Sequence, residues 1–108
     1  MDTDAAVKVL GGGLAGSTVL NRKAAGMLAG EFAPGFRIDL HHKDMGIVTA
    51  AAREAGVTIP LGAHVAQLIG SLRATGRGDL DHSALFLLVE ELSGRSPGSQ
   101  PDQDAKEA

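Results

Sequence analysis

The chain has 108 residues, 44% hydrophobic and only 3% aromatic, without cysteine, so one domain fits and disulfides and thiolate metal sites are excluded. The formal net charge is −3 with interspersed signs, which excludes a basic nucleic-acid-binding face, and no apolar run is long enough to cross a membrane. We therefore expect a cytoplasmic protein, and its Ala- and Leu-rich, aromatic-poor composition favours packed helices over sheets.

The first predicted helix is short and runs from Ala5 to Leu10, with its N-cap at Asp2, Thr3 or Asp4. Three consecutive glycines, Gly11 to Gly13, follow it. They are expected to end the helix because a helical glycine costs more backbone entropy than other residues do.

Gly11, Gly13 and Gly16 also match G-x-G-x-x-G, the fingerprint of dinucleotide-binding domains. That fingerprint requires a preceding strand, a βαβ unit and an acidic residue at a strand end about 20 positions later. The only acidic residue near that position is Glu31, in a predicted loop, and no strand-forming run follows. We interpret the glycines as a helix break followed by a small-residue face around Gly16 that lets another helix approach.

The second predicted helix spans Ala15 to about Ala29, and a loop from Gly30 to Phe36 follows. Arg22 and Lys23 are expected to face away from most of its apolar residues, which are Val19, Leu20, Ala24, Met27 and Leu28. The third helix is predicted from Asp39 to Ala55, before a stop at Gly56. Its expected apolar stripe consists of Leu40, Ile47, Val48, Ala51 and Ala55.

An extended link from Val57 to Pro60 separates this helix from a fourth, predicted from Leu61 to Thr75. The apolar face of the fourth helix consists of Val65, Leu68, Ile69 and Leu72. Asp81 is the predicted N-cap of a fifth helix, Ser83 to Leu92, whose inward residues are Leu85, Leu88, Val89 and Leu92, with Phe86 and Leu87 widening the stripe.

The composition changes after Gly94 to Ser, Pro, Gln, Asp and Lys, which cannot bury enough apolar area to order a segment. We therefore predict an all-α bundle of about five helices over residues 1–94 and a disordered tail over 95–108.

Five short motifs follow one another along this predicted bundle. They are Gly-Gly-Gly-Leu-Ala-Gly-Ser at 11–17, Phe-x-Pro-Gly-Phe at 32–36, Leu-x-x-Lys-Asp at 40–44, Gly-Val-x-x-Pro at 56–60 and Gly-x-Gly-x-x-Asp-x-Ser-Ala at 76–84. In this order they resemble the C-terminal domain of the β-hydroxyacid dehydrogenases, a 6-phosphogluconate dehydrogenase-like fold. The family includes 3-hydroxyisobutyrate dehydrogenase and 2-hydroxy-3-oxopropionate (tartronate semialdehyde) reductase, and residues 37–44 look closer to the latter branch.

The resemblance implies an oxidoreductase that uses NAD or NADP on a small hydroxyacid or semialdehyde substrate. In that family a Rossmann domain binds the cofactor, a helix before the present ones carries the catalytic lysine, and the helical domain closes the cleft. By this resemblance the chain lacks the Rossmann domain and the catalytic lysine, so it contains no catalytic residue and is expected to be inactive alone. Its expected partners are that Rossmann domain, the substrate and further copies in a homo-oligomer.

Three residues receive site roles from the resemblance. Lys43 is expected to contact the cofactor, while Phe36 and Asp44 shape the active-site wall. Each has an ordinary structural alternative: Lys43 as a solvated helix lysine, Phe36 as a core residue, and Asp44 as a first-turn charge favoured by the helix dipole. Because adjacent helix residues cannot share a face, we expect Lys43 and Asp44 to point in different directions.

The four histidines do not form a recognisable metal site. His41 and His42 are adjacent and point about 100° apart on a helix, and His64 and His82 belong to other elements. We therefore expect no bound metal and interpret the histidines as partly exposed, with one of the adjacent pair able to lie at a cleft rim as a pH-sensitive group.

A helical dimerisation or interaction module without catalysis is the alternative function.

Overall fold

The computed structural model describes residues 1–95, and the predicted disordered tail from Ser96 onward lies outside them. The described part is all-α, as predicted, and contains five α-helices, one 3-10 helix and no strand. The helices are α1 (Thr3–Gly11), α2 (Thr18–Ala29), α3 (Ile38–Ala55), α4 (Pro60–Ala74) and α5 (Leu85–Leu92), with the 3-10 helix η1 (His82–Ala84) leading into α5.

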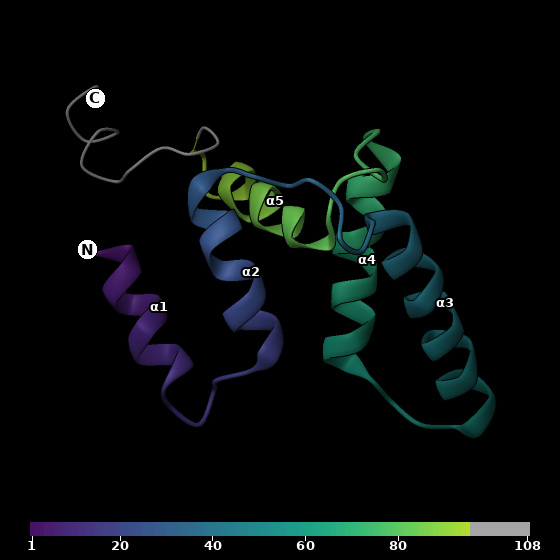
Figure 1. The fold of residues 1–108 in the computed structure, drawn as a ribbon. Coiled ribbons are helices and arrows are strands. Elements are labelled where there is room, and N and C mark those ends of the chain that lie inside the picture. The colour runs from purple at the N-terminus through teal and green to yellow at the C-terminus, as the bar shows by residue number, and fades with distance from the viewer. Residues whose placement is uncertain (96–108) are drawn as a thin grey trace.

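Figure 1 shows two helical pairs with α5 between them. The hairpin of α3 and α4 forms the largest contact in the described chain, and α1 packs on α2. Helix α5 contacts α4, while η1 contacts both α2 and α3, so the segment that begins at His82 joins the two pairs. None of these helices is long and apolar enough to cross a membrane.

The core lies where α3, α4 and α5 meet. Ile38, Ile69 and Leu72 are fully buried there, and Leu88 joins them. The predicted apolar face of α4 is confirmed, since Ile69 and Leu72 are buried and Val65 and Leu68 pack against the cluster. Pro60 occupies the first turn of α4, where its missing N–H leaves no intrahelical bond unmade.

The predicted stripe of α3 is wrong after Leu40, since Ile47, Val48, Ala51 and Ala55 are all exposed. Ile47 is 61% exposed and Val48 is 48% exposed, because α3 turns a different face toward α4. That face carries His42, whose ring would lie 3.7 Å from a Cβ placed on Gly70 of α4. Small residues let the two helices approach here, which hydrophobic periodicity does not reveal. In α5, Val89 and Leu92 are likewise exposed rather than inward.

The start of α2 also differs from the prediction. The helix begins at Thr18 rather than Ala15, because the Ser17 hydroxyl accepts a hydrogen bond from the backbone N–H of Leu20 at 3.0 Å and caps it. A Cβ on Gly16 would lie 2.5 Å from the carbonyl oxygen of Gly11. The glycines therefore serve a tight helix-to-helix turn within the loop itself, not an approach by another helix.

The first turn of α3 is completed by another segment. Arg37 precedes the helix and offers no side-chain cap. Instead, the N–H groups of Ile38 and Asp39 donate to the carbonyl oxygens of Leu80 and Gly78 at 2.9 and 3.0 Å. This pairing satisfies two donors that a helix start leaves open. It fixes the loop before α3 beside the loop before η1, and the candidate site lies there.

Candidate functional site

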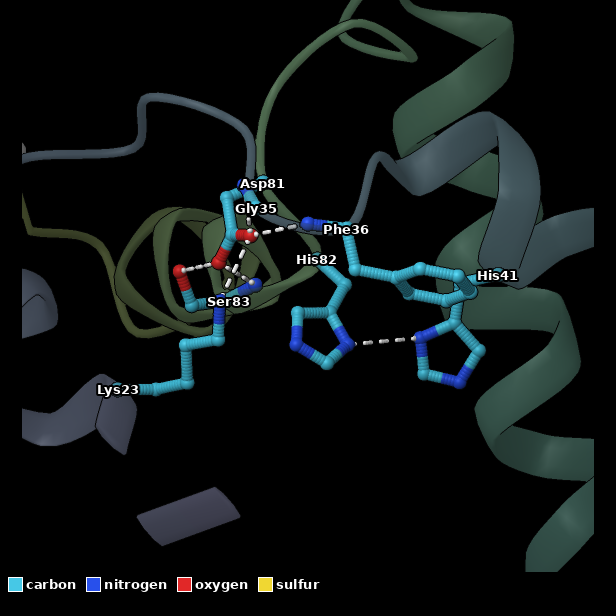
Figure 2. A network of polar contacts seen from close by, with 7 residues as sticks. All are labelled: Lys23, Gly35, Phe36, His41, Asp81, His82 and Ser83. Atoms are coloured by element: carbon cyan, nitrogen blue, oxygen red, sulfur yellow. Dashed lines mark hydrogen bonds and ion pairs between the residues drawn. The ribbon is translucent and has the colours of Figure 1, made fainter. Parts of the chain in front are cut away.

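Asp81 is the centre of the polar contacts between these two loops. Its side chain is almost fully buried, and Figure 2 shows the groups that surround it. One oxygen, Oδ1, accepts hydrogen bonds from Lys23 Nζ and from the backbone N–H groups of Gly35 and Phe36, each at 2.9 Å. The other, Oδ2, accepts from the Ser83 backbone N–H at 3.1 Å and from its hydroxyl at 2.5 Å.

These bonds favour the charged form of the carboxylate. Burial by itself raises the pKa of Asp81, but the hydrogen bonds from Ser83, from the Phe36 N–H and from Lys23 outweigh it and hold this pKa well below its ordinary value. Asp81 is therefore an anion in the folded protein and holds α2, the Phe36 loop and η1 together.

Lys23 corrects a sequence expectation. It was predicted to face away from the apolar side of α2, yet its ammonium reaches inward and forms an ion pair with Asp81 across 58 positions of sequence. Its side chain is only 26% exposed. The methylene groups of a lysine can lie along apolar neighbours while the ammonium reaches a charge, and helical spacing cannot foresee such a partner.

Phe36, His41 and His82 form an aromatic cluster beside this ion pair. The ring centroids of Phe36 and His82 are 5.3 Å apart in an edge-to-face arrangement, and those of Phe36 and His41 are 5.8 Å apart. The Nδ1 atoms of His41 and His82 face each other at 3.3 Å, as Figure 2 shows. Burial lowers the pKa of His82; the Asp81 charge opposes this effect, and His41 and Lys23 add to it.

A groove of about 520 Å³ opens beside the cluster, between α2 and α5. We call it the α2–α5 groove. Its apolar lining consists of Val19, Leu20, Met27, Leu85, Phe86 and Val89, and its polar lining consists of Ser17, Lys23, His41, His82 and Ser83. An apolar hollow with a few convergent polar groups is the usual form of a binding site.

The other two predicted site residues lie apart from this groove. Lys43 and Asp44 do not line it, and their side chains are 64% and 50% exposed on α3. The Lys43 ammonium lies 3.8 Å from an Asp44 oxygen, so the two form a loose ion pair instead of diverging as expected. The structure thus joins Phe36 to the histidines and leaves Lys43 and Asp44 on an open face.

The arrangement permits only part of a nicotinamide cofactor site within residues 1–95. The Lys43 ammonium is exposed, and its carboxylate partner is farther away than a strong charge-assisted hydrogen bond requires, so a phosphate could compete for it. No strand precedes the Gly11–Gly16 turn in the described chain, so a nucleotide cradle is not formed there.

The sequence predicts that Asp81 is a helix N-cap. This is confirmed, because its side chain accepts a hydrogen bond from the Ser83 N–H and caps η1. Its three further partners come from α2 and the Phe36 loop, more than 40 residues away. The Asp-x-Ser spacing is the one local signal of the site. Within residues 1–95, no group of three or more His, Asp or Glu side chains is placed to hold a metal ion.

Comparison with known proteins gives consistent matches, of which a family model and two relatives are described first. The family model described as "NAD-binding of NADP-dependent 3-hydroxyisobutyrate dehydrogenase" matches residues 1–89. The chain is 39% identical to 3-sulfolactaldehyde reductase of Escherichia coli over 84% of its own length, and 35% identical to 2-hydroxy-3-oxopropionate reductase of the same organism over 80%. It spans 31% and 30% of those two proteins, about a third of their length.

A solved structure shows the same fold. The crystal structure of 3-hydroxyisobutyrate dehydrogenase from Salmonella typhimurium superimposes with a TM-score of 0.77 at 22% identity. The match covers 82% of this chain and 31% of that one. The helical arrangement in Figure 1 is therefore that of one part of a larger known protein.

Proposed function

This chain belongs to the β-hydroxyacid (3-hydroxyisobutyrate) dehydrogenase family as its helical NAD-binding C-terminal domain, and we propose that it closes the active-site cleft of an NAD(P)-dependent reductase. The observation that carries the proposal is the extent of the family match. It covers residues 1–89, nearly all of the described fold, while the chain spans only about a third of its relatives. The chain therefore acts together with a cofactor-binding Rossmann domain.

The residues of this chain bind and shape; none of them performs the proton transfer. Lys43 would contact the cofactor on its nicotinamide side, and its exposed ammonium supports a charge-assisted contact of this kind. Phe36 contributes an apolar ring to the wall that excludes water from the reacting atoms, and Asp44 extends that wall from the open face of α3 beside Lys43 once the Rossmann domain is in place. The bound cofactor supplies the hydride. Lys23 forms an ion pair with Asp81, so it is not available as the acid or base. We therefore expect the 108 residues alone to be inactive.

The substrate is a small anionic aldehyde or the matching hydroxyacid. We propose 2-hydroxy-3-oxopropionate, because residues 37–44 resemble that branch of the family. The relative with 39% identity is named 3-sulfolactaldehyde reductase. 3-Sulfolactaldehyde is therefore the second substrate to compare with 2-hydroxy-3-oxopropionate in an activity assay. The choice between NAD and NADP is made in the Rossmann domain, so both are tested.

A chimera tests the role of Lys43. In this chimera the chain replaces the matched segment of the E. coli 2-hydroxy-3-oxopropionate reductase, and the relative supplies the rest of the enzyme. Lys43→Ala in the chimera is expected to weaken binding of NADH or NADPH about tenfold, because one charge-assisted contact is lost. Isothermal titration calorimetry measures the affinity.

The matched control is Arg53→Ala, which removes another exposed cation from the same helix and is expected to leave the cofactor affinity unchanged. Equal affinities for Lys43→Ala and the unmodified chimera would remove Lys43 from the cofactor site.

One observation favours the alternative function, a helical dimerisation module without catalysis. Large apolar side chains are exposed on α1 and α3, among them Val9, Leu10, Ile47 and Val48. A contiguous apolar patch of this composition would mark an interface, so the alternative is tested by whether the chain self-associates. The DNA sequence around the coding region separates the two functions: an adjoining in-frame Rossmann domain supports the reductase, and self-association without one supports the module.

A further inference from the structure

The His41 and His82 imidazoles make a hydrogen bond that depends on one proton. Their Nδ1 atoms lie 3.3 Å apart and point at each other (Figure 2). A neutral imidazole has one donor nitrogen and one acceptor nitrogen, whereas a protonated imidazole has two donors. The bond therefore exists only while one of the two Nδ1 atoms carries a proton and the other does not.

This bond joins two segments that are 41 positions apart in sequence, the first turn of α3 and η1. Phe36 packs against both rings, which completes a three-ring cluster. The backbone repeats the connection, since the N–H of His82 donates to the Phe36 carbonyl oxygen at 2.7 Å. A change in the imidazole pair therefore acts directly on Phe36, because its ring contacts both imidazoles.

The charges around the pair oppose a second proton. Lys23 of α2 is the permanent cation in the lining of the α2–α5 groove, and α5 contributes only the apolar Leu85, Phe86 and Val89 to that lining. Asp81 attracts a proton toward His82, yet its carboxylate is already engaged by Lys23, the Ser83 hydroxyl and three backbone N–H groups. Burial, His41 and Lys23 together lower the pKa of His82.

Two imidazolium rings at this distance would have two donors and no acceptor between them. They would also repel each other beside Lys23, in a partly buried place where screening by water is weak. The repulsion is relieved when the rings turn apart or separate, and either movement removes the side-chain contact of His41 with η1.

We propose that His41 and His82 form a proton-sensitive latch. With at most one added proton the latch holds the start of α3 and Phe36 against η1. The second proton breaks the pair, moves the His41 ring away from His82 and Phe36, and widens the α2–α5 groove at the place where the two histidines line it. The latch is a property of this chain alone and does not depend on its role in a reductase.

Nuclear magnetic resonance of the full 108-residue chain tests the latch. The ¹⁵N shifts of the imidazoles report which Nδ1 carries the proton, and a nuclear Overhauser effect between the Phe36 and His41 rings reports the closed cluster. As the pH falls from about 8, we expect His82 to take up its proton at a lower pH than an ordinary histidine does, because burial, His41 and Lys23 lower its pKa. The Phe36–His41 effect is expected to disappear once both rings are protonated.

His41→Leu removes one partner and retains an apolar side chain beside Phe36. The pKa of His82 is expected to rise in this variant because the His41 charge no longer opposes the proton, and a nuclear Overhauser effect between the Phe36 and His82 rings should persist at acidic pH. His64→Leu, an exposed histidine of α4, is the matched control and should behave as the unmodified chain does. If His41→Leu does not fold, His82→Leu with the Phe36–His41 effect as readout replaces it.

A His82 pKa that His41→Leu leaves unchanged, or a Phe36–His41 effect that survives full protonation of both rings, would overturn the proposal. Such a result would leave the proposed reductase function untouched, because that function rests on the family match and not on the histidine pair.

Discussion

At the scale of single residues, one buried carboxylate organises the candidate site. Asp81 receives hydrogen bonds from a lysine, a serine and three backbone N–H groups, which belong to α2, the Phe36 loop and η1. Each of these partners would be costly to leave unpaired in a half-buried place. The position of Phe36, the residue assigned to the active-site wall, is therefore a consequence of Asp81.

Asp81→Asn should lower the free energy of unfolding by about 2–4 kcal/mol, because it leaves the Lys23 charge without its anion and removes an acceptor. Urea unfolding followed by circular dichroism measures the change. Asp79→Asn, two residues earlier and exposed, is the matched control and should shift stability by less than about 0.5 kcal/mol. Equal effects of the two substitutions would show that the Asp81 network contributes no particular stability.

Stability should fall in two steps as the pH decreases. Folding lowers the pKa of His82, so the unfolded chain binds that proton more readily, and stability declines as the pH drops below the ordinary value of 6.5. Folding also lowers the pKa of Asp81, so a second decline begins below its ordinary value of 3.8. Urea unfolding at a series of pH values checks both. The Asp81→Asn variant should lack the step at lower pH. If this step persists in the variant, it arises from other carboxylates.

At the scale of elements, composition and periodicity predicted the helices well and their contacts less well. The all-α class and all five helices are as expected, because glycine and proline breaks lie between strongly helical runs. The inward face of α3 was not predictable, because close packing through small residues on α4 competes with the Ile47 and Val48 stripe. Lys23 was missed for a related reason: its partner, Asp81, is local in space but not in sequence.

Two glycine substitutions separate a required glycine from a replaceable one. Gly16→Ala should destabilise the chain by about 1–3 kcal/mol, since its Cβ would meet the Gly11 carbonyl oxygen and only a backbone shift could relieve the contact. Gly46→Ala should stabilise it by about 0.5–1 kcal/mol, because this helical glycine of α3 has open space around its Cβ position. Thermal unfolding of both variants measures the difference, and a stabilising Gly16→Ala would contradict the turn geometry.

At the scale of the whole molecule, the fold has a small core and a large open surface. Six hydrophobic residues are buried in the described chain, while eleven large hydrophobics are exposed. A domain that closes over a partner is expected to leave apolar surface uncovered when it stands alone. The family match covers residues 1–89, so this balance describes the helical domain of the family taken by itself.

The central claim is that this chain completes a reductase and does not catalyse alone. The direct measurement is NADH or NADPH oxidation with 2-hydroxy-3-oxopropionate, followed for the purified 108-residue chain and for its chimera with the rest of the E. coli relative. We predict background rates for the chain and, for the chimera, turnover at least about a hundredfold higher. A folded chimera without activity, or turnover by the isolated chain, would contradict the account.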